Sequence, residues 1–292
     1  MRKPQHTGAF LLAAFSLLLA ATDAHLARSE DQAPGGVAPA HANCQPSAFR
    51  AVVDVGHTLD VPGALSARGV PEYAFNMQLG RQIKETLVGA GFDKTVLFIT
   101  GKAPPVGLFE RAMAANRLPA DLFISIHHDS VPDNLMQTWQ YEGQDQHYND
   151  DYPGYALFIS KDNADRAGSL QFGKFLGKAL QARSLQFTPH YTLPLMGNRR
   201  RQLLDADAGV YRYDQLVVLR HTRMPALLLE AGSIVNRQEE LALATPERRT
   251  LTSDAVAAAV EDFCAARAKP IIERLVGRPA NPRTASPGAV AR

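Results

Sequence analysis

The stretch Asp121–Ser130, which reads DLFISIHHDS, places the strongest constraint on how this chain can fold. Its apolar run, Leu122–Ile126, is long enough for one buried strand and stops abruptly at His127, His128 and Asp129. Open α/β sheets bind their ligands at the carboxyl ends of the strands, and these residues would stand there. A histidine pair in a polar loop after a strand is the alternative explanation. The choice depends on whether other predicted strands end in similar residues.

Two further apolar runs end in the same way. Ala51–Val55 is followed by Gly56 and His57, and Ala226–Leu229 is followed by Glu230. Helical patterns separate the strands, and this alternating order predicts an α/β domain with a mostly parallel sheet. The other strands are expected at 94–100, 154–160 and 215–220, and the helices at 71–90, 108–118, 163–183 and 245–263. Residues 131–152 are expected to form a long loop over the site, whereas 184–214 show no clear pattern.

Glu72 stands in the first turn of the first long helix, directly after Pro71. The apolar stripe of this helix starts at Phe75, so Glu72 points toward the same side. A carboxylate on the buried side of a helix is costly unless a positive group faces it. An exposed acid that interacts with the helix dipole is the alternative. Because the helix follows the strand that ends at His57, its first turn lies at the edge where the strands end.

The four ionisable residues are therefore expected to converge. The carboxyl ends of parallel strands share one edge of a sheet, which would bring together His57, His127 and Glu230 beside Glu72. Two histidines and one carboxylate with an open fourth position form a catalytic zinc site. A second carboxylate near the bound water commonly acts as the general base. The pattern predicts a site for Zn²⁺ that performs hydrolysis.

The amino terminus reads as a secretory signal. Residues 1–24 combine a basic start with an apolar run that ends in small residues, and the run is too short for a comfortable membrane span. An uncleaved anchor is the alternative. Residues 25–47 read as a disordered linker, 48–269 as the catalytic domain and 270–292 as a disordered tail. We expect an exported protein, in the periplasm or secreted, without a stable membrane anchor after cleavage.

The charged residues and the cysteines add two expectations. The formal net charge is only +2 and no basic run alternates with aromatic residues, so nothing indicates nucleic-acid binding. The short basic cluster Arg199–Arg201 is either a solvated loop or a contact for an anionic polymer. Cys44 and Cys264 could form one disulfide in an exported protein, which would join the two ends of the domain.

Three segments together resemble the zinc-dependent Amidase_3 family of N-acetylmuramoyl-L-alanine amidases. The first segment contains VVDVGH, followed by PGA, GVPE and N. The second contains R, followed by AN and PADLFISIHHDS. The third is PALLLEAGSIVN. The resemblance covers about residues 50–265. It implies a twisted mixed sheet flanked by helices, and cleavage of the amide that joins N-acetylmuramic acid to L-alanine of the peptidoglycan stem peptide.

The resemblance also assigns roles. It makes His57, Glu72 and His127 the zinc ligands and Glu230 the catalytic glutamate. Further residues of the motifs are candidates for support of the ligands or contact with substrate: His128, Asp129, Arg111 and Asn116. Peptidoglycan is the expected partner, and some relatives also need an activator protein.

The chain departs from the family's pattern at three places. Thr58-Leu59-Asp60 replaces a glycine-rich turn, His128 and Asp129 stand where Ala and Asn are frequent, and Gly232-Ser233 follows Glu230. None of these changes removes a ligand or the catalytic glutamate. Two other functions stay open: another exported zinc amidohydrolase or peptidase that acts on cell-wall peptides, and a peptidoglycan-binding protein without catalysis. A serine hydrolase is disfavoured, because Ser125 and Ser130 lack the glycine pattern of a nucleophile elbow.

Overall fold

The computed structural model describes residues 44–268. The signal peptide expected at 1–24, the tail expected at 270–292 and most of the expected linker lie outside the described residues. The strands are β1 (Ala51–Val55), β2 (Val96–Phe98), β3 (Leu122–Asp129), β4 (Gln137–Tyr141), β5 (Gln144–Tyr148), β6 (Ala156–Ile159), β7 (Gln202–Asp205), β8 (Val210–Arg212) and β9 (Ala226–Ser233). The α-helices are α1 (Glu72–Gly89), α2 (Val106–Arg117), α3 (Arg166–Gln181), α4 (Val217–His221), α5 (Arg237–Leu243) and α6 (Pro246–Arg267). The 3₁₀ helices are η1 (Asp133–Leu135), η2 (His190–Thr192) and η3 (Pro194–Arg199).

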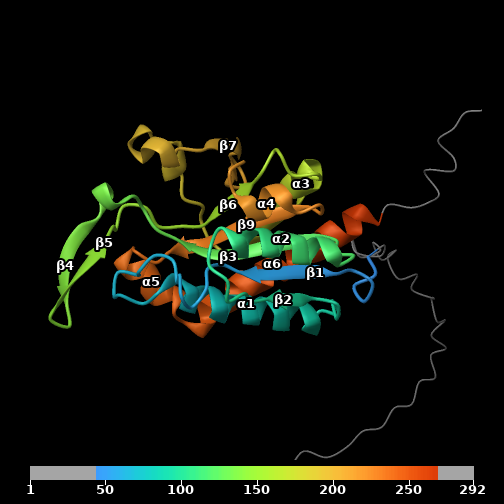
Figure 1. Cartoon of the computed structure of the whole chain (residues 1–292), viewed down its shortest axis with the longest axis horizontal. Helices are drawn as coiled ribbons and strands as arrows, with labels where there is room; N and C mark the ends of the chain where they lie inside the picture. Colours follow the sequence, from blue (N-terminus) through green and yellow to red (C-terminus); the bar gives the residue numbers. More distant parts are fainter. Residues whose placement is uncertain (1–43, 269–292) are drawn as a thin grey trace, which may run out of the picture. The chain divides into compact units, whose positions relative to one another are not determined.

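Seven strands form one mixed sheet in the order β2-β1-β3-β9-β6-β8-β7 (Figure 1). The neighbours from β2 to β9 run parallel, β6 is antiparallel to β9 and parallel to β8, and β7 is antiparallel to β8. The predicted α/β fold with a mostly parallel, mixed sheet flanked by helices is confirmed.

Helices cover both faces of the sheet. On one face α1, α3 and α6 bury their apolar stripes, including Leu79, Phe172 and Phe263. On the other face a second cluster joins Phe123 of β3 to Leu219 of α4, with Ala115 of α2 also buried there. Side chains alternate between the two faces along a strand, so β3 contributes to both clusters. Within the described residues, no helix is both long and apolar enough to cross a membrane.

The structure corrects several expected boundaries. The strands β3 and β9 continue to Asp129 and Ser233, so His127 and Glu230 lie inside strands rather than after them. The expected strand at 215–220 is instead the short helix α4. Its apolar residues are compatible with either a strand or a helix. Val218 and Leu219 pack against the face of the sheet instead of adding a strand to its edge, so tertiary packing decides for the helix.

The two long segments also contain more structure than expected. The expected loop at 131–152 contains η1 and the antiparallel hairpin β4–β5, which extends away from the seven-stranded sheet (Figure 1). Its turn is made by Glu142 and Gly143, both at positive φ, as a two-residue turn of type I′ requires. Residues 184–214 supply η2, η3, β7 and β8. The helix α5 was not expected.

A disulfide joins Cys44 to Cys264 of α6, with the two Cα atoms 5.2 Å apart. Cys44 falls within the expected linker, so the described domain begins before the expected boundary at 48. The bond closes a segment in which the two cysteines are separated by 220 positions, and long closed loops lose the most entropy in the unfolded chain.

We expect reduction of this bond to lower the free energy of unfolding by about 2–5 kcal/mol. Thermal unfolding of the oxidised and reduced protein measures the difference. The double variant Cys44→Ser/Cys264→Ser should unfold at the temperature of the reduced protein and should not respond to reductant. Equal midpoints for oxidised and reduced wild type would show that the bond contributes nothing to stability.

Candidate active site

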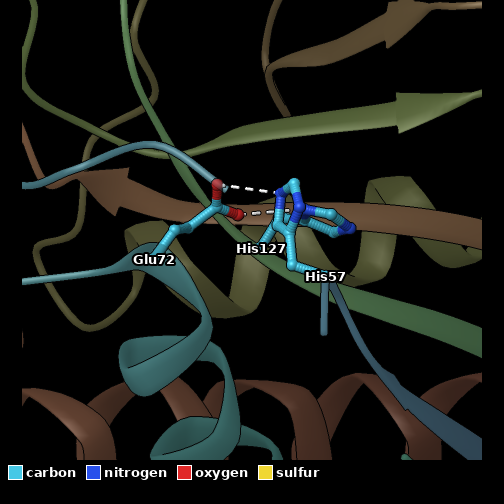
Figure 2. A group of neighbouring side chains, drawn as sticks. All are labelled: His57, Glu72 and His127. Atoms are coloured by element: carbon cyan, nitrogen blue, oxygen red, sulfur yellow. Dashed lines mark hydrogen bonds and ion pairs between the residues drawn. The ribbon is translucent and has the colours of Figure 1, made fainter. Parts of the chain in front are cut away.

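Three side chains meet at the carboxyl edge of β1 and β3 (Figure 2). Glu72, the first residue of α1, directs its carboxylate toward both His57, just after β1, and His127 of β3. Its Oε2 is 3.0 Å from His57 Nε2, and its Oε1 is 3.0 Å from His127 Nδ1. One ligand atom from each residue lies within 4.8 Å of the others.

Two glycines make room for this group. A Cβ atom at Gly56 would lie 2.4 Å from the His127 ring, far inside van der Waals contact. Gly63 has φ of +83°, and a Cβ there would lie 2.5 Å from Glu72 Oε2 and 2.7 Å from the His57 ring. Only glycine combines that backbone conformation with so close an approach. The loop after β1 therefore packs directly against the metal-ligand candidates.

The carboxylate of Glu72 is held in place by the surrounding chain. It accepts hydrogen bonds from Asn76 Nδ2 at 3.0 Å and from the backbone amides of Ala64 and His128. Burial acts to raise the pKa of Glu72, but hydrogen bonds with His127 and His57 outweigh it and hold the pKa well below its usual range. The ligand candidate is thus ionised.

His128 supports the same carboxylate indirectly. Its Nδ1 lies 2.8 Å from Asn76 Oδ1, so Asn76 connects His128 to Glu72. Burial lowers the pKa of His128 to about 3, which leaves the ring neutral and able to donate from Nδ1 to Asn76. Asn76 was not singled out from the sequence. Its signals were its place one turn after Glu72 and in the motif GVPE…N.

Glu230 lies on the strand beside His127. The two residues are register partners on β3 and β9, so their side chains point to the same face of the sheet. Glu230 Oε2 is buried and has no hydrogen-bond partner within residues 44–268. Burial raises the pKa of Glu230 well above its usual range, and the carboxylates of Asp129 and Glu72 raise it further. A carboxyl group in this setting can both accept and return a proton.

Asp129 anchors a neighbouring wall of the site. Tyr191 of η2 donates its hydroxyl to Asp129 Oδ1 at 2.6 Å, and Arg199 Nη2 lies 3.8 Å from the same oxygen. Burial raises the pKa of Asp129 to about 6, although the hydrogen bond from Tyr191 opposes this shift. Tyr191 was not expected at the site, because it lies in the segment without a clear sequence pattern.

Arg111 fixes the end of β1 through its buried guanidinium. Its guanidinium pairs with the buried Asp54 at 2.6 Å and donates to the carbonyls of Val55 and His57. Arg111 therefore holds the backbone that presents His57. Asn116 does not join the group: its amide bonds the backbone of His221 and Arg223, across the contact between α2 and α4.

Two pockets meet at His57 and His127. The first, which we call the Glu230 pocket, has a volume of about 360 Å³. Its lining includes Glu72, Asp129, Tyr191, Arg199, Arg201, Tyr213 and Glu230. The second, the α4 pocket, has a volume of about 260 Å³. Besides the two histidines it is lined by Leu108, Leu216, Val217 and Val218, among others, and not by Glu230.

The residues present fit a zinc ion. Two imidazole nitrogens and one carboxylate oxygen are the donor set of His₂Glu catalytic zinc sites. Their separation of at most 4.8 Å is compatible with one shared ion, and both histidines face a pocket that leaves a fourth position accessible.

Comparison with known proteins agrees with the family resemblance that the sequence motifs indicated. The family model Amidase_3, described as N-acetylmuramoyl-L-alanine amidase, matches residues 51–262. N-acetylmuramoyl-L-alanine amidase Rv3717 of Mycobacterium tuberculosis is 24% identical over 246 residues, which is 84% of this chain and 82% of that protein. A putative N-acetylmuramoyl-L-alanine amidase of Buchnera aphidicola is 20% identical over 227 residues, covering 74% and 97% of the two chains.

Solved structures show the same fold. The amidase Ami1 of Mycobacterium smegmatis superposes with a TM-score of 0.56 at 18% identity, over 75% of this chain and 97% of that one. An N-acetylmuramoyl-L-alanine amidase of Clostridium difficile gives 0.54 at 18% identity, over 74% and 96%. The match to the family model spans most of the chain, and the chain therefore belongs to the Amidase_3 family of N-acetylmuramoyl-L-alanine amidases.

Proposed function

We propose that this chain is an exported, zinc-dependent hydrolase that cleaves the amide bond between N-acetylmuramic acid and L-alanine of the stem peptide. In this proposal His57, Glu72 and His127 hold the zinc and Glu230 transfers the proton. One observation carries it: three ligand atoms within 4.8 Å of one another belong to side chains that line the same pocket as Glu230.

The proposed mechanism divides the work between metal and protein. When bound, zinc would polarise the amide carbonyl and make an attacking water more acidic. Glu230 accepts a proton from that water as the water attacks the amide carbonyl. The protonated Glu230 donates to the departing L-alanine nitrogen. Asn76 and the backbone amides around Glu72 keep the ligand carboxylate oriented throughout.

Export and partners belong to the proposal as well. A basic start and an apolar run support a signal peptide at residues 1–24, and a peptidoglycan substrate requires a protein outside the cytoplasm. We also propose that the enzyme binds an activator protein, and one structural relative supports this. The CwlD amidase of Clostridioides difficile, 18% identical with a TM-score of 0.51, was solved in complex with the GerS lipoprotein.

Digestion of purified sacculi tests the proposal against the other functions. We expect the protein to release stem peptides that begin with a free L-alanine amino group, identified by mass spectrometry. Removal of metal with a chelator should abolish the release, and added Zn²⁺ should restore it. Release of D-alanine alone would indicate a carboxypeptidase, and binding without release would indicate a non-catalytic protein. Either result would contradict the proposed function.

A further inference from the structure

The position of Glu230 distinguishes the two pockets chemically. This step rests on the proposed function, in which Glu230 returns its proton to the departing L-alanine nitrogen. Glu230 lines only the Glu230 pocket, so the nitrogen and the stem peptide attached to it occupy that pocket. The lactyl side of the amide then lies toward the more apolar α4 pocket.

The Glu230 pocket contains a guanidinium that lacks an acidic partner. Arg201 makes no ion pair within residues 44–268. Its Nη1 donates to the carbonyls of Asn198 at 2.7 Å and of Arg200 at 2.9 Å. Its guanidinium carbon lies 3.6 Å from the centre of the Tyr213 ring, so the group is stacked on that ring and held in one plane.

These contacts leave one edge of Arg201 free. Its Nε is buried and has no hydrogen-bond partner in the described part of the chain, and Nη2 makes no hydrogen bond there either. Nε and Nη2 form the side of the guanidinium that binds a carboxylate through two parallel hydrogen bonds. A buried donor without a partner costs free energy, which an incoming acceptor would recover.

Arg199 lines the same pocket but is already engaged. Its Nη2 donates to the Ser130 carbonyl at 2.8 Å and lies 3.8 Å from Asp129. The charge of Asp129 therefore offsets that of Arg199, whereas the charge of Arg201 has no such neighbour among its recorded contacts. The Glu230 pocket thus offers one uncompensated cation to a ligand.

We propose that the free Nε–Nη2 edge of Arg201 binds a carboxylate group of the stem peptide, on the leaving-group side of the scissile amide. This contact makes the enzyme selective for stem peptides whose carboxylates are free rather than amidated. It also places the peptide so that its amino-terminal nitrogen faces Glu230.

The test compares two substrates. Sacculi are used untreated, or after carbodiimide and ammonia have converted their stem-peptide carboxylates to primary amides. Initial rates of stem-peptide release are measured by mass spectrometry. We expect wild type to cleave untreated sacculi at least about tenfold faster, the size expected for a hydrogen bond to a charged group. In Arg201→Gln the ratio of the two rates should fall toward one, and Arg201→Lys should retain part of it.

Arg200→Gln is the matched control, because Arg200 is exposed, donates to the Thr192 carbonyl and does not line either pocket. It should keep the wild-type ratio. Equal wild-type rates on the two substrates would overturn the inference, as would an unchanged ratio in Arg201→Gln. If the ratio of the two rates fell as far in Arg200→Gln as in Arg201→Gln, the inference would also be overturned. That result would indicate a general attraction of basic residues to an anionic polymer. Failure of wild type to release stem peptides from untreated sacculi would instead count against the proposed function.

Discussion

Replacement of Glu230 by glutamine is expected to lower the rate of stem-peptide release by about 10²- to 10⁴-fold, the range for loss of a general acid–base. The amide cannot accept the proton of the attacking water or return it to the leaving nitrogen. Zinc content should stay at the wild-type level, because Glu230 makes no recorded hydrogen bond to the three ligand candidates. Rate and zinc content are measured on the same preparation.

A control variant separates this effect from a general loss of carboxylates. Glu247 is exposed in the first turn of α6, and Glu247→Gln should retain wild-type activity. The assigned role of Glu230 would be wrong if Glu230→Gln kept its zinc and hydrolysed sacculi at a rate near that of wild type.

Replacement of His127 by alanine is expected to remove both zinc and activity. It deletes one of three ligand candidates and the 3.0 Å contact that holds Glu72 Oε1. The remaining histidine and carboxylate make a far weaker site, since structural and catalytic zinc sites use at least three protein ligands. Metal analysis after dialysis should find little zinc in His127→Ala, whereas Glu230→Gln should keep it.

His221→Ala is the matched control for this experiment. Its imidazole is exposed at the end of α4 and lines neither pocket, so zinc and activity should be unchanged. Retention of a full zinc equivalent by His127→Ala would contradict the ligand assignment, even if activity were lost.

The convergence of His57, Glu72, His127 and Glu230 could be predicted because these residues interrupt strong local patterns. His57, His127 and Glu230 each stand in or after a run of buried apolar residues, where an ionisable group has no structural reason to be. Glu72 shares the side of a helix with an apolar stripe. Such interruptions identify which residues meet, although the strands β3 and β9 extend further than the apolar runs that predicted them.

The supporting residues could not be predicted in the same way. Tyr191, Arg199 and Arg201 come from a segment without periodicity. Only the tertiary fold places Tyr191 beside Asp129 and Arg199 beside Ser130, which lie 62 and 69 positions earlier in the chain. The hairpin β4–β5 alternates polar and aromatic residues, so it lacks the apolar signal of a buried strand. The apolar residues of α4 are compatible with either a strand or a helix, and packing beside α2 selected the helix.

Location of zinc by anomalous diffraction at its absorption edge tests the central claim most directly. We expect one peak, within about 2.0–2.2 Å of a nitrogen of His57, a nitrogen of His127 and a carboxylate oxygen of Glu72. The Glu230 carboxyl group should face this ion without binding it. The absence of a peak between these three side chains in zinc-loaded, active protein would contradict the account, as would a peak held by other residues.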